Sequence, residues 1–246
     1  MNKIITVTSS KGGVGKTTFS MMLADIYSKN HRVLLLDLDI FSGSLAFAFG
    51  IKPKYSIYDL CEDIDDDIKL DKYIYEYSEN ISLISAPLDN RVSSKIKTKN
   101  ITQVLEKLRS KYEVIIIDTS HVINEINMIV YSLSYKIIDI FTNDSYDLQN
   151  TKRFISIAKN IDVDNLVLIL NNSINSDKKF FSNLEIKNIL KKSIDYTIDN
   201  TLYLKDYDEI VIGSDLIKFK DLQDREKYKL LSKNMINLLE GDIDEE

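Results

Sequence analysis

Short apolar runs and longer amphipathic segments alternate along most of the chain. The apolar runs are rich in β-branched residues and predict strands at 4–8, 33–36, 81–85, 114–117, 137–141, 166–170 and 194–198. The amphipathic segments carry apolar residues at helical spacing and predict helices at 16–29, 101–109, 125–133, 148–158, 183–191 and 222–239. Runs that are apolar at nearly every position are typical of parallel strands covered on both faces. The pattern therefore predicts an α/β fold, with a mostly parallel twisted sheet and helices on both faces.

No change in composition divides this pattern into parts. The chain has two prolines, no internal repeat and no linker rich in Pro, Gly or Ser. Its 246 residues fit one α/β domain, because such domains reach about 250 residues without splitting. We therefore expect a single domain over residues 1–240 and a short acidic tail at 241–246.

The composition argues against several classes of protein. An apolar fraction of 44% with 28% charged residues is typical of a globular chain, and no apolar run is long enough to span a bilayer. The first ten residues do not have the pattern of a secretory signal. The single cysteine, Cys61, and the two histidines, His31 and His121, exclude intrachain disulfides and Cys- or His-rich metal sites. The net charge of −6 argues against nucleic acid as a partner, and we expect a cytoplasmic protein.

A glycine-rich segment, KGGVGKTT at 11–18, lies between the first predicted strand and the first predicted helix. Glycines let successive backbone N–H groups point inward as an anion site, and the start of the helix adds its positive dipole end. Lys16 can then reach the β- and γ-phosphates of a nucleotide, while the Thr17 hydroxyl binds Mg²⁺. We expect the phosphates to be bound by Gly12, Gly13, Val14, Gly15, Lys16, Thr17 and Thr18.

Two departures from the standard phosphate loop point to a family. Ser10 stands where the standard pattern has glycine, and a second lysine, Lys11, opens the loop. In this the segment resembles the deviant Walker A ATPases of the MinD/ParA group. The resemblance extends over most of the chain and implies a single-domain P-loop NTPase fold that binds ATP and Mg²⁺. It also implies a homodimer in which Lys11 reaches the ATP of the other subunit and takes part in catalysis together with Lys16, as an arginine finger does.

Three aspartates follow predicted strands. Asp37 and Asp39 end the second strand, and Asp118 ends the apolar run VIII, which has the Walker B pattern. Open α/β sheets bind ligands at this carboxyl edge. The resemblance implies that Asp39 orients the attacking water, that Asp37 belongs to the Mg²⁺ shell through a water, and that Asp118 holds Mg²⁺ through a water. Taken singly, Asp37 and Asp39 could also be strand-end caps.

Adenine recognition has a weaker signal. Asn171 follows a late strand, where the family often has an asparagine, and its amide offers both a donor and an acceptor to the base. A plain turn at the strand end is the alternative. The family's usual Ile-Pro pair is Ile198-Asp199 here, and its proline after the Walker B aspartate is replaced within Thr119-Ser120-His121.

The spacing Asp-x-Asp-x-x-x-Gly at 37–43 is similar to the CpaE/TadZ branch, which is associated with type IV (Flp/Tad) pilus assembly. The resemblance therefore implies an ATP-dependent dimerisation switch, slow in hydrolysis, whose protein partner belongs to a pilus or secretion system. A MinD-like division or flagellar-placement ATPase, a ParA-like DNA partition ATPase and a nucleotide-binding scaffold without hydrolysis remain alternatives. The acidic end of the chain would be repelled by an anionic membrane, so we expect recruitment to the membrane or a cell pole only through a partner.

Overall fold

The computed structural model describes residues 2–40, 42–65, 67–93, 95–161, 163–172, 181–198 and 226–241. Its centre is an eight-stranded sheet with the strand order β3-β4-β2-β5-β1-β6-β7-β8. The strands are β1 (Lys3–Thr8), β2 (Val33–Leu38), β3 (Tyr75–Glu76), β4 (Ile81–Ile84), β5 (Val114–Thr119), β6 (Lys136–Phe141), β7 (Leu166–Asn171) and β8 (Tyr196–Ile198). Strands β2, β4 and β5, as well as β7, are buried at every position, which explains their continuous apolar runs.

All neighbouring strands of the sheet are parallel except β3, which pairs antiparallel with β4 through Tyr75 and Leu83. Strand β1 lies between β5 and β6, with Val7 opposite Asp118 on one side and Ile138 on the other. The chain runs from β1 toward β2 and later returns to add β6 on the other side. The strand order therefore reverses at β1, and in open α/β sheets ligands bind at the carboxyl end of that point.

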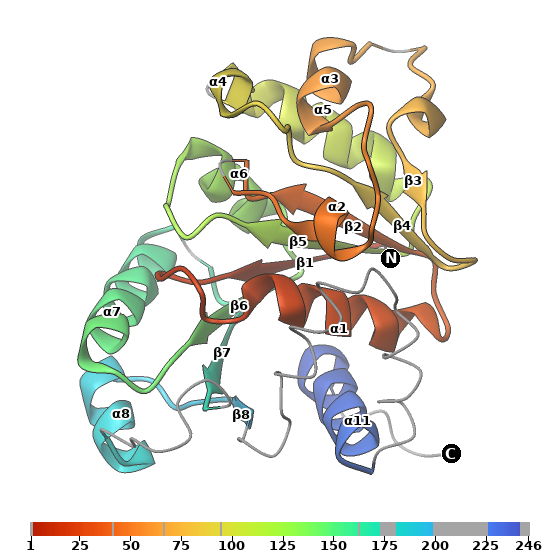
Figure 1. Cartoon of the computed structure of the whole chain (residues 1–246). Helices are drawn as coiled ribbons and strands as arrows, with labels where there is room; N and C mark the ends of the chain where they lie inside the picture. Colours follow the sequence, from red (N-terminus) through yellow and green to blue (C-terminus); the bar gives the residue numbers. More distant parts are fainter. Residues whose placement is uncertain are drawn as a thin grey trace.

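Helices cover both faces of the sheet (Figure 1). The helical segments are α1 (Lys16–Ser28), α2 (Leu45–Ala48), α3 (Ile57–Glu62), the 3₁₀ turn η1 (Leu70–Lys72), α4 (Asn90–Ser93), α5 (Thr98–Arg109), α6 (Glu125–Leu133), α7 (Ser145–Asn160), α8 (Asn183–Leu190) and α11 (Glu226–Glu240). On one face α1 and α11 enclose a core with the side chains of β1 and β2 that point toward them. On the other face α3, α5 and α6 form a second core, which α7 and α8 continue toward β7.

Helix α11 packs on α1 through four apolar side chains at helical spacing, while Leu230 is exposed. Tyr228, Leu231, Met235 and Leu239 are fully buried in the core that α1 shares with the sheet. The Tyr228 hydroxyl donates a hydrogen bond of 2.7 Å to Asp25 of α1. The apolar face of this helix is therefore used within the chain itself.

The predicted fold class is confirmed: one α/β domain with a mostly parallel sheet. Each predicted strand and helix is present, with ends that differ by at most three residues within the described part of the chain. Positions 222–225 at the start of the last predicted helix, the tail at 242–246 and Asp199 lie outside the described residues. Five short elements were not predicted, namely α2, α3, η1, α4 and the antiparallel edge strand β3. Among the described residues, no helix is both long enough and apolar enough to cross a membrane.

Candidate nucleotide-binding site

The glycine-rich loop leaves the carboxyl end of β1 and enters α1, at the point where the strand order reverses. Gly13 and Gly15 have φ angles of 74° and 97°, a conformation that residues with a Cβ rarely adopt. Gly15 is the N-cap of α1, and this helix start has no side-chain cap and no acidic residue in its first turn. Backbone N–H groups at the start of a helix need an acceptor, so this loop can bind an anion.

The predicted lysine lies at the base of this loop. Lys16 is the first residue of α1, and only 7% of its surface is exposed. Its ammonium forms no ion pair with any side chain that the structure describes. The lysine lines the hollow into which the loop opens, and its charge acts on the nearby Asp118. Phosphate oxygens at the loop would give the ammonium direct hydrogen-bond partners. The position therefore fits the predicted role in binding phosphate.

Thr17 and Asp118 meet although they are 101 positions apart in sequence. The Thr17 hydroxyl donates a hydrogen bond of 2.6 Å to Asp118 Oδ2, while Asp118 Oδ1 is buried without a hydrogen-bond partner in the described structure. Burial raises the pKa of Asp118 to about 6, and Lys16 and the Thr17 hydroxyl oppose this rise. The Ser20 hydroxyl acts on the same carboxylate, although not at hydrogen-bonding geometry.

This pair fits a Mg²⁺ ion that arrives with a nucleotide. A hard cation takes oxygen ligands, and the orphaned Asp118 oxygen and the Thr17 hydroxyl offer two at the loop. Among the described residues, no group of three or more His, Cys, Asp or Glu side chains could hold a metal. Mg²⁺ with few protein ligands and the remainder from phosphate and water is the usual arrangement at phosphate loops.

Asp37 acts as a cap at the end of its strand, the alternative that the sequence left open. Its two oxygens accept backbone hydrogen bonds of 3.1 Å, one from Asp39 and one from Leu45. It therefore fixes both ends of the loop between β2 and α2. Burial raises the pKa of Asp37 well above its usual range, and the nearby Asp118 carboxylate adds to the rise. This contact does not test a place in the Mg²⁺ shell, which stays a prediction.

Gly43 explains the spacing of the same loop. A Cβ at this position would lie 2.3 Å from the Cβ of Ala86 and 3.0 Å from Asp37 Oδ2. Only glycine lets the loop pass this close to the residues that follow β4. The Asp-x-Asp-x-x-x-Gly pattern therefore has a packing reason in this fold.

The loop opens into a hollow of about 390 Å³. Its lining comprises Gly12, Gly13, Gly15, Lys16, Thr17, Thr18, Asp39, Ser42, Ser44 and His121. The structure thus brings the phosphate loop and Asp39 together, as predicted, and adds three residues that were not predicted. Ser44 Oγ lies 3.4 Å from Thr17 Oγ1, and His121 comes from the segment after β5. No periodicity or motif marks these three, because their position depends on loops that meet only in the fold.

Asn171 lies beside the phosphate loop. It is the last residue of β7, it is buried, and its amide nitrogen donates a hydrogen bond of 2.9 Å to the backbone oxygen of Val14. A Cβ on Gly15 would lie 3.0 Å from the same nitrogen. The observed contact supports the loop, and adenine recognition by Asn171 stays a prediction.

Lys11 is bound within its own chain. Its ammonium lies 2.7 Å from Asp144 Oδ2 at the start of α7. Hydrogen bonding to Asp144 raises the pKa of Lys11, so the lysine stays charged. Asp144 was not among the predicted site residues.

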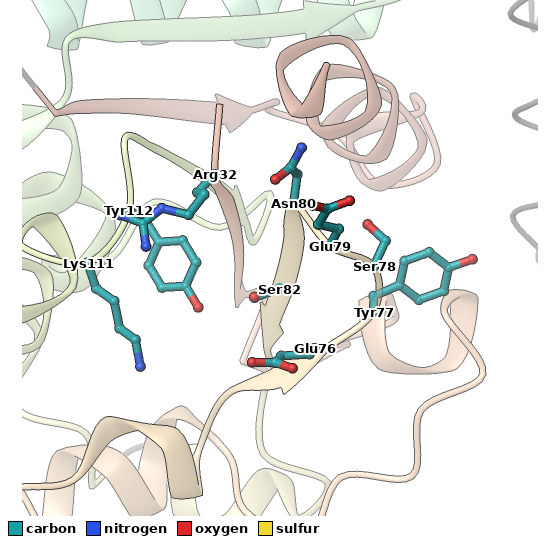
Figure 2. A pocket seen from close by; sticks show the side chains of 9 residues that line it. All are labelled: Arg32, Glu76, Tyr77, Ser78, Glu79, Asn80, Ser82, Lys111 and Tyr112. Carbon is teal, nitrogen blue, oxygen red and sulfur yellow. The ribbon is translucent and has the colours of Figure 1, made fainter. Parts of the chain in front are cut away.

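A second hollow, of about 440 Å³, lies at the opposite edge of the sheet (Figure 2). Arg32 and Tyr112 face Glu76, Glu79 and Asn80 across it. It has no glycine loop and no helix N-terminus among its lining residues, and the charges of Glu76 and Glu79 offset those of Arg32 and Lys111. The smaller hollow at the carboxyl edge is therefore the better candidate for a nucleotide site.

A parallel sheet with a glycine-rich phosphate loop at its switch point, a buried lysine and a paired Thr and Asp defines a P-loop nucleotide-binding protein. A family model described as an AAA domain matches residues 2–175. The chain belongs to this family.

The chain is similar to the septum site-determining protein MinD of a Synechocystis species, with 27% identity over 173 residues that cover 70% of this chain and 65% of that protein. It spans a little under two thirds of the length of the first curated relatives it matches, 63% and 65%. A ParA family ATPase from Chlorobium tepidum has a similar structure, with a TM-score of 0.82 at 18% identity over 97% of this chain and 99% of that chain. A MinD protein complexed with Mg-ADP from Pyrococcus horikoshii has a TM-score of 0.76 at 21% identity over 98% of this chain and 95% of that chain. At these identities the two structures establish the fold alone.

Proposed function

We propose that this protein is an ATP-dependent dimerisation switch that binds and slowly hydrolyses Mg-ATP to control the localisation or assembly of a partner. The strongest support is the buried Lys16 without an ion-pair partner among the described side chains, at the base of an uncapped helix start. The Thr17 and Asp118 pair supports Mg²⁺ as the accompanying ion.

The chemistry follows from the residues around the loop. Bound Mg²⁺ would neutralise negative charge on the β- and γ-phosphates. Lys16 binds the same oxygens, the α1 N–H groups hold the phosphates in position, and Thr18 lies at the α-phosphate. Asp39, which lines the same hollow, orients the attacking water. Lys11 of a second copy completes the site.

Exposed apolar side chains support dimerisation through the nucleotide face. Phe47, Leu88, Val122 and Tyr146 are 67%, 80%, 52% and 69% exposed. They follow β2, β4, β5 and β6 respectively, so all four lie toward the carboxyl edge where the phosphate loop opens. Apolar side chains around one edge indicate an interaction site, and a second copy facing the first would cover them.

The partner class is inferred from the relatives and from α11. Relatives named septum site-determining proteins favour a positioning function of the MinD type. A pilus or secretion system is the second candidate, and the loop spacing at 37–43 favours it. The buried apolar stripe of α11 argues that this helix does not itself bind a membrane, so a partner would recruit the protein there.

The basic cluster that DNA partition would use contains the exposed Lys187 and Lys191, while Lys178 and Lys179 lie outside the described residues.

Phosphate release tests hydrolysis against a scaffold that only binds nucleotide. If two copies complete the site, the release rate per protomer rises with protein concentration and reaches a plateau. Lys11→Ala should bind ATP but lose this rise, with a rate lower by up to about 10³-fold, the lower range for a group supplied in trans. A wild-type rate of zero at every concentration would show a scaffold, and a rate independent of concentration would exclude the shared site.

A further inference from the structure

The ammonium of Lys11 has two possible positions that exclude each other. In the structure it lies 2.7 Å from Asp144 Oδ2, and the Lys11 side chain is 38% exposed. The proposed function requires the same ammonium at the phosphates of a second copy. One lysine cannot occupy both places, so Asp144 competes with the second copy for Lys11.

Hydrogen bonds within its own segment fix the Asp144 carboxylate in the position that contacts Lys11. As the N-cap of α7 it accepts a hydrogen bond of 2.9 Å from Asp147 N through Oδ1. Its Oδ2, the atom that binds Lys11, also lies 2.8 Å from the Thr142 hydroxyl. Thr142 is itself fixed, because its backbone N–H donates a hydrogen bond of 2.7 Å to Asp147 Oδ2. The carboxylate therefore does not need to be ordered before it binds the lysine.

The electrostatics of α7 also point to Asp144 as the group that holds Lys11 there. The N-terminus of a 16-residue helix carries a positive dipole end, which disfavours a cation. The negative charges of Asp144 and the buried Asp147 outweigh this positive helix end near Lys11, and both act to raise the pKa of Lys11. Without the charge of Asp144, the electrostatic attraction that holds the Lys11 ammonium beside α7 would be much weaker.

The loop around Lys11 leaves the side chain room to move. The Lys11 backbone oxygen accepts a hydrogen bond of 2.7 Å from the Ser9 hydroxyl, which anchors the main chain. Gly12 and Gly13 follow, both exposed, and no atom lies within 4 Å of where their Cβ atoms would be. The side chain can therefore leave Asp144 without displacing packed neighbours.

We propose that Asp144 is a positioning residue that holds Lys11 in the monomer, so that dimerisation on ATP begins with the loss of this ion pair. The proposal rests on the proposed function, since it assumes a dimer that needs Lys11. An exposed ion pair changes an equilibrium constant by about 1.4- to 5-fold. Each dimer forms with the loss of two such pairs, one in each copy, so the factor applies twice. Asp144→Asn should therefore tighten the ATP-dependent dimer by about 2- to 30-fold. Asparagine is a preferred N-cap residue, so the variant keeps the start of α7.

Sedimentation velocity with a non-hydrolysable ATP analogue and Mg²⁺ would measure the dimer dissociation constant. Asp144→Asn is compared with wild type and with Asp71→Asn, which removes an ion pair with Lys111 at the opposite edge of the sheet. We expect a tighter dimer for Asp144→Asn alone. A purely structural role of Asp144 would weaken the dimer or leave it unchanged, and either result would overturn the proposal.

A second measurement does not depend on dimerisation. NMR titration of reductively methylated Lys11 in the nucleotide-free monomer should show a lower pKa in Asp144→Asn than in wild type. An unchanged pKa would overturn the proposal and leave the dimerisation switch intact. If the pKa falls but neither protein dimerises at any concentration, the proposed function fails and Asp144 loses this role with it.

Discussion

The carboxylate of Asp118 shows at the residue scale how burial and neighbours set the chemistry of the site. The residue is fully buried, and burial raises its pKa to about 6. Lys16 and the Thr17 hydroxyl stabilise its charged form but do not offset the burial completely. A buried carboxylate of this kind destabilises the fold in its charged form, and a Mg²⁺ ion bound to it would offset that cost.

This predicts an inverse dependence of stability on pH. The folded chain binds the Asp118 proton more tightly than the unfolded chain, whose pKa is near 3.8, so stability falls as the pH rises from 3.8 through about 6. Asp118→Asn removes this contribution. Between pH 5 and 7 without metal, the free energy of unfolding in urea should fall by about 1 kcal/mol more for wild type than for the variant. The same slope in both proteins would contradict the assignment.

Single residues of the site were predictable where a motif carries them. Lys16, Thr17 and Asp118 were expected from the glycine loop and the Walker B pattern, and the structure brings them together. Asp144 and His121 were not predicted, because no motif marks them and each reaches the site from a loop after another strand. Asp144 and Asp147 have the spacing of a helix N-cap, which could have placed the start of α7 but not the contact with Lys11.

At the scale of elements, the loop between β2 and α2 is defined by its close approach to the end of β4. Asp37 binds both of its ends, and Gly43 passes the Ala86 side chain without room for a Cβ. Asp39 and Ser44 reach the nucleotide hollow from this loop. Its packing therefore controls the position of the residue proposed to orient water.

Gly43→Ala should displace this loop. The added Cβ would lie 2.3 Å from that of Ala86, an overlap that costs about 1–3 kcal/mol in stability. Chemical denaturation should show the lower stability, and titration with Mg-ATP should show a weaker affinity. Ala86→Gly in the same chain removes the overlap and should restore part of both, whereas a double variant no better than Gly43→Ala would contradict the packing explanation.

The regular elements were predictable because their patterns are long. Buried strands such as β5 and β7 have apolar runs of at least four residues, and α5 has clear helical spacing. The four residues of α2 are too few to show a period, and β3 has only two residues, which pair with β4 through the fold. Helix α3 did have a local signal, the capping box of Ser56 and Asp59.

At the scale of the whole molecule, the two edges of the sheet differ. The carboxyl edge carries the phosphate loop and the exposed apolar side chains of Phe47, Leu88 and Tyr146. The opposite edge has a polar hollow with charges of both signs. A dimer that forms through the carboxyl edge would enclose two nucleotides and leave the opposite edges free.

Asp39→Ala should separate dimerisation from hydrolysis. The variant keeps Lys16, Thr17 and Lys11, so it should bind Mg-ATP and dimerise, but it would orient no water for attack. Size exclusion with light scattering should show a lasting dimer in ATP, while wild type returns to monomer as ATP is consumed. A variant that stays monomeric and hydrolyses ATP at the wild-type rate would refute this role.

Isothermal titration calorimetry with Mg-ATP tests the central claim most directly, namely that the loop from Gly12 to Thr18 and Lys16 bind a triphosphate. We predict one site per chain, with an affinity at least about 30-fold weaker in Lys16→Ala, because truncating one member of a buried charge pair costs 2 kcal/mol or more. Lys111→Ala, at the hollow on the opposite edge, should bind as wild type does. No heat from the wild-type protein, or equal affinity in Lys16→Ala, would contradict the account.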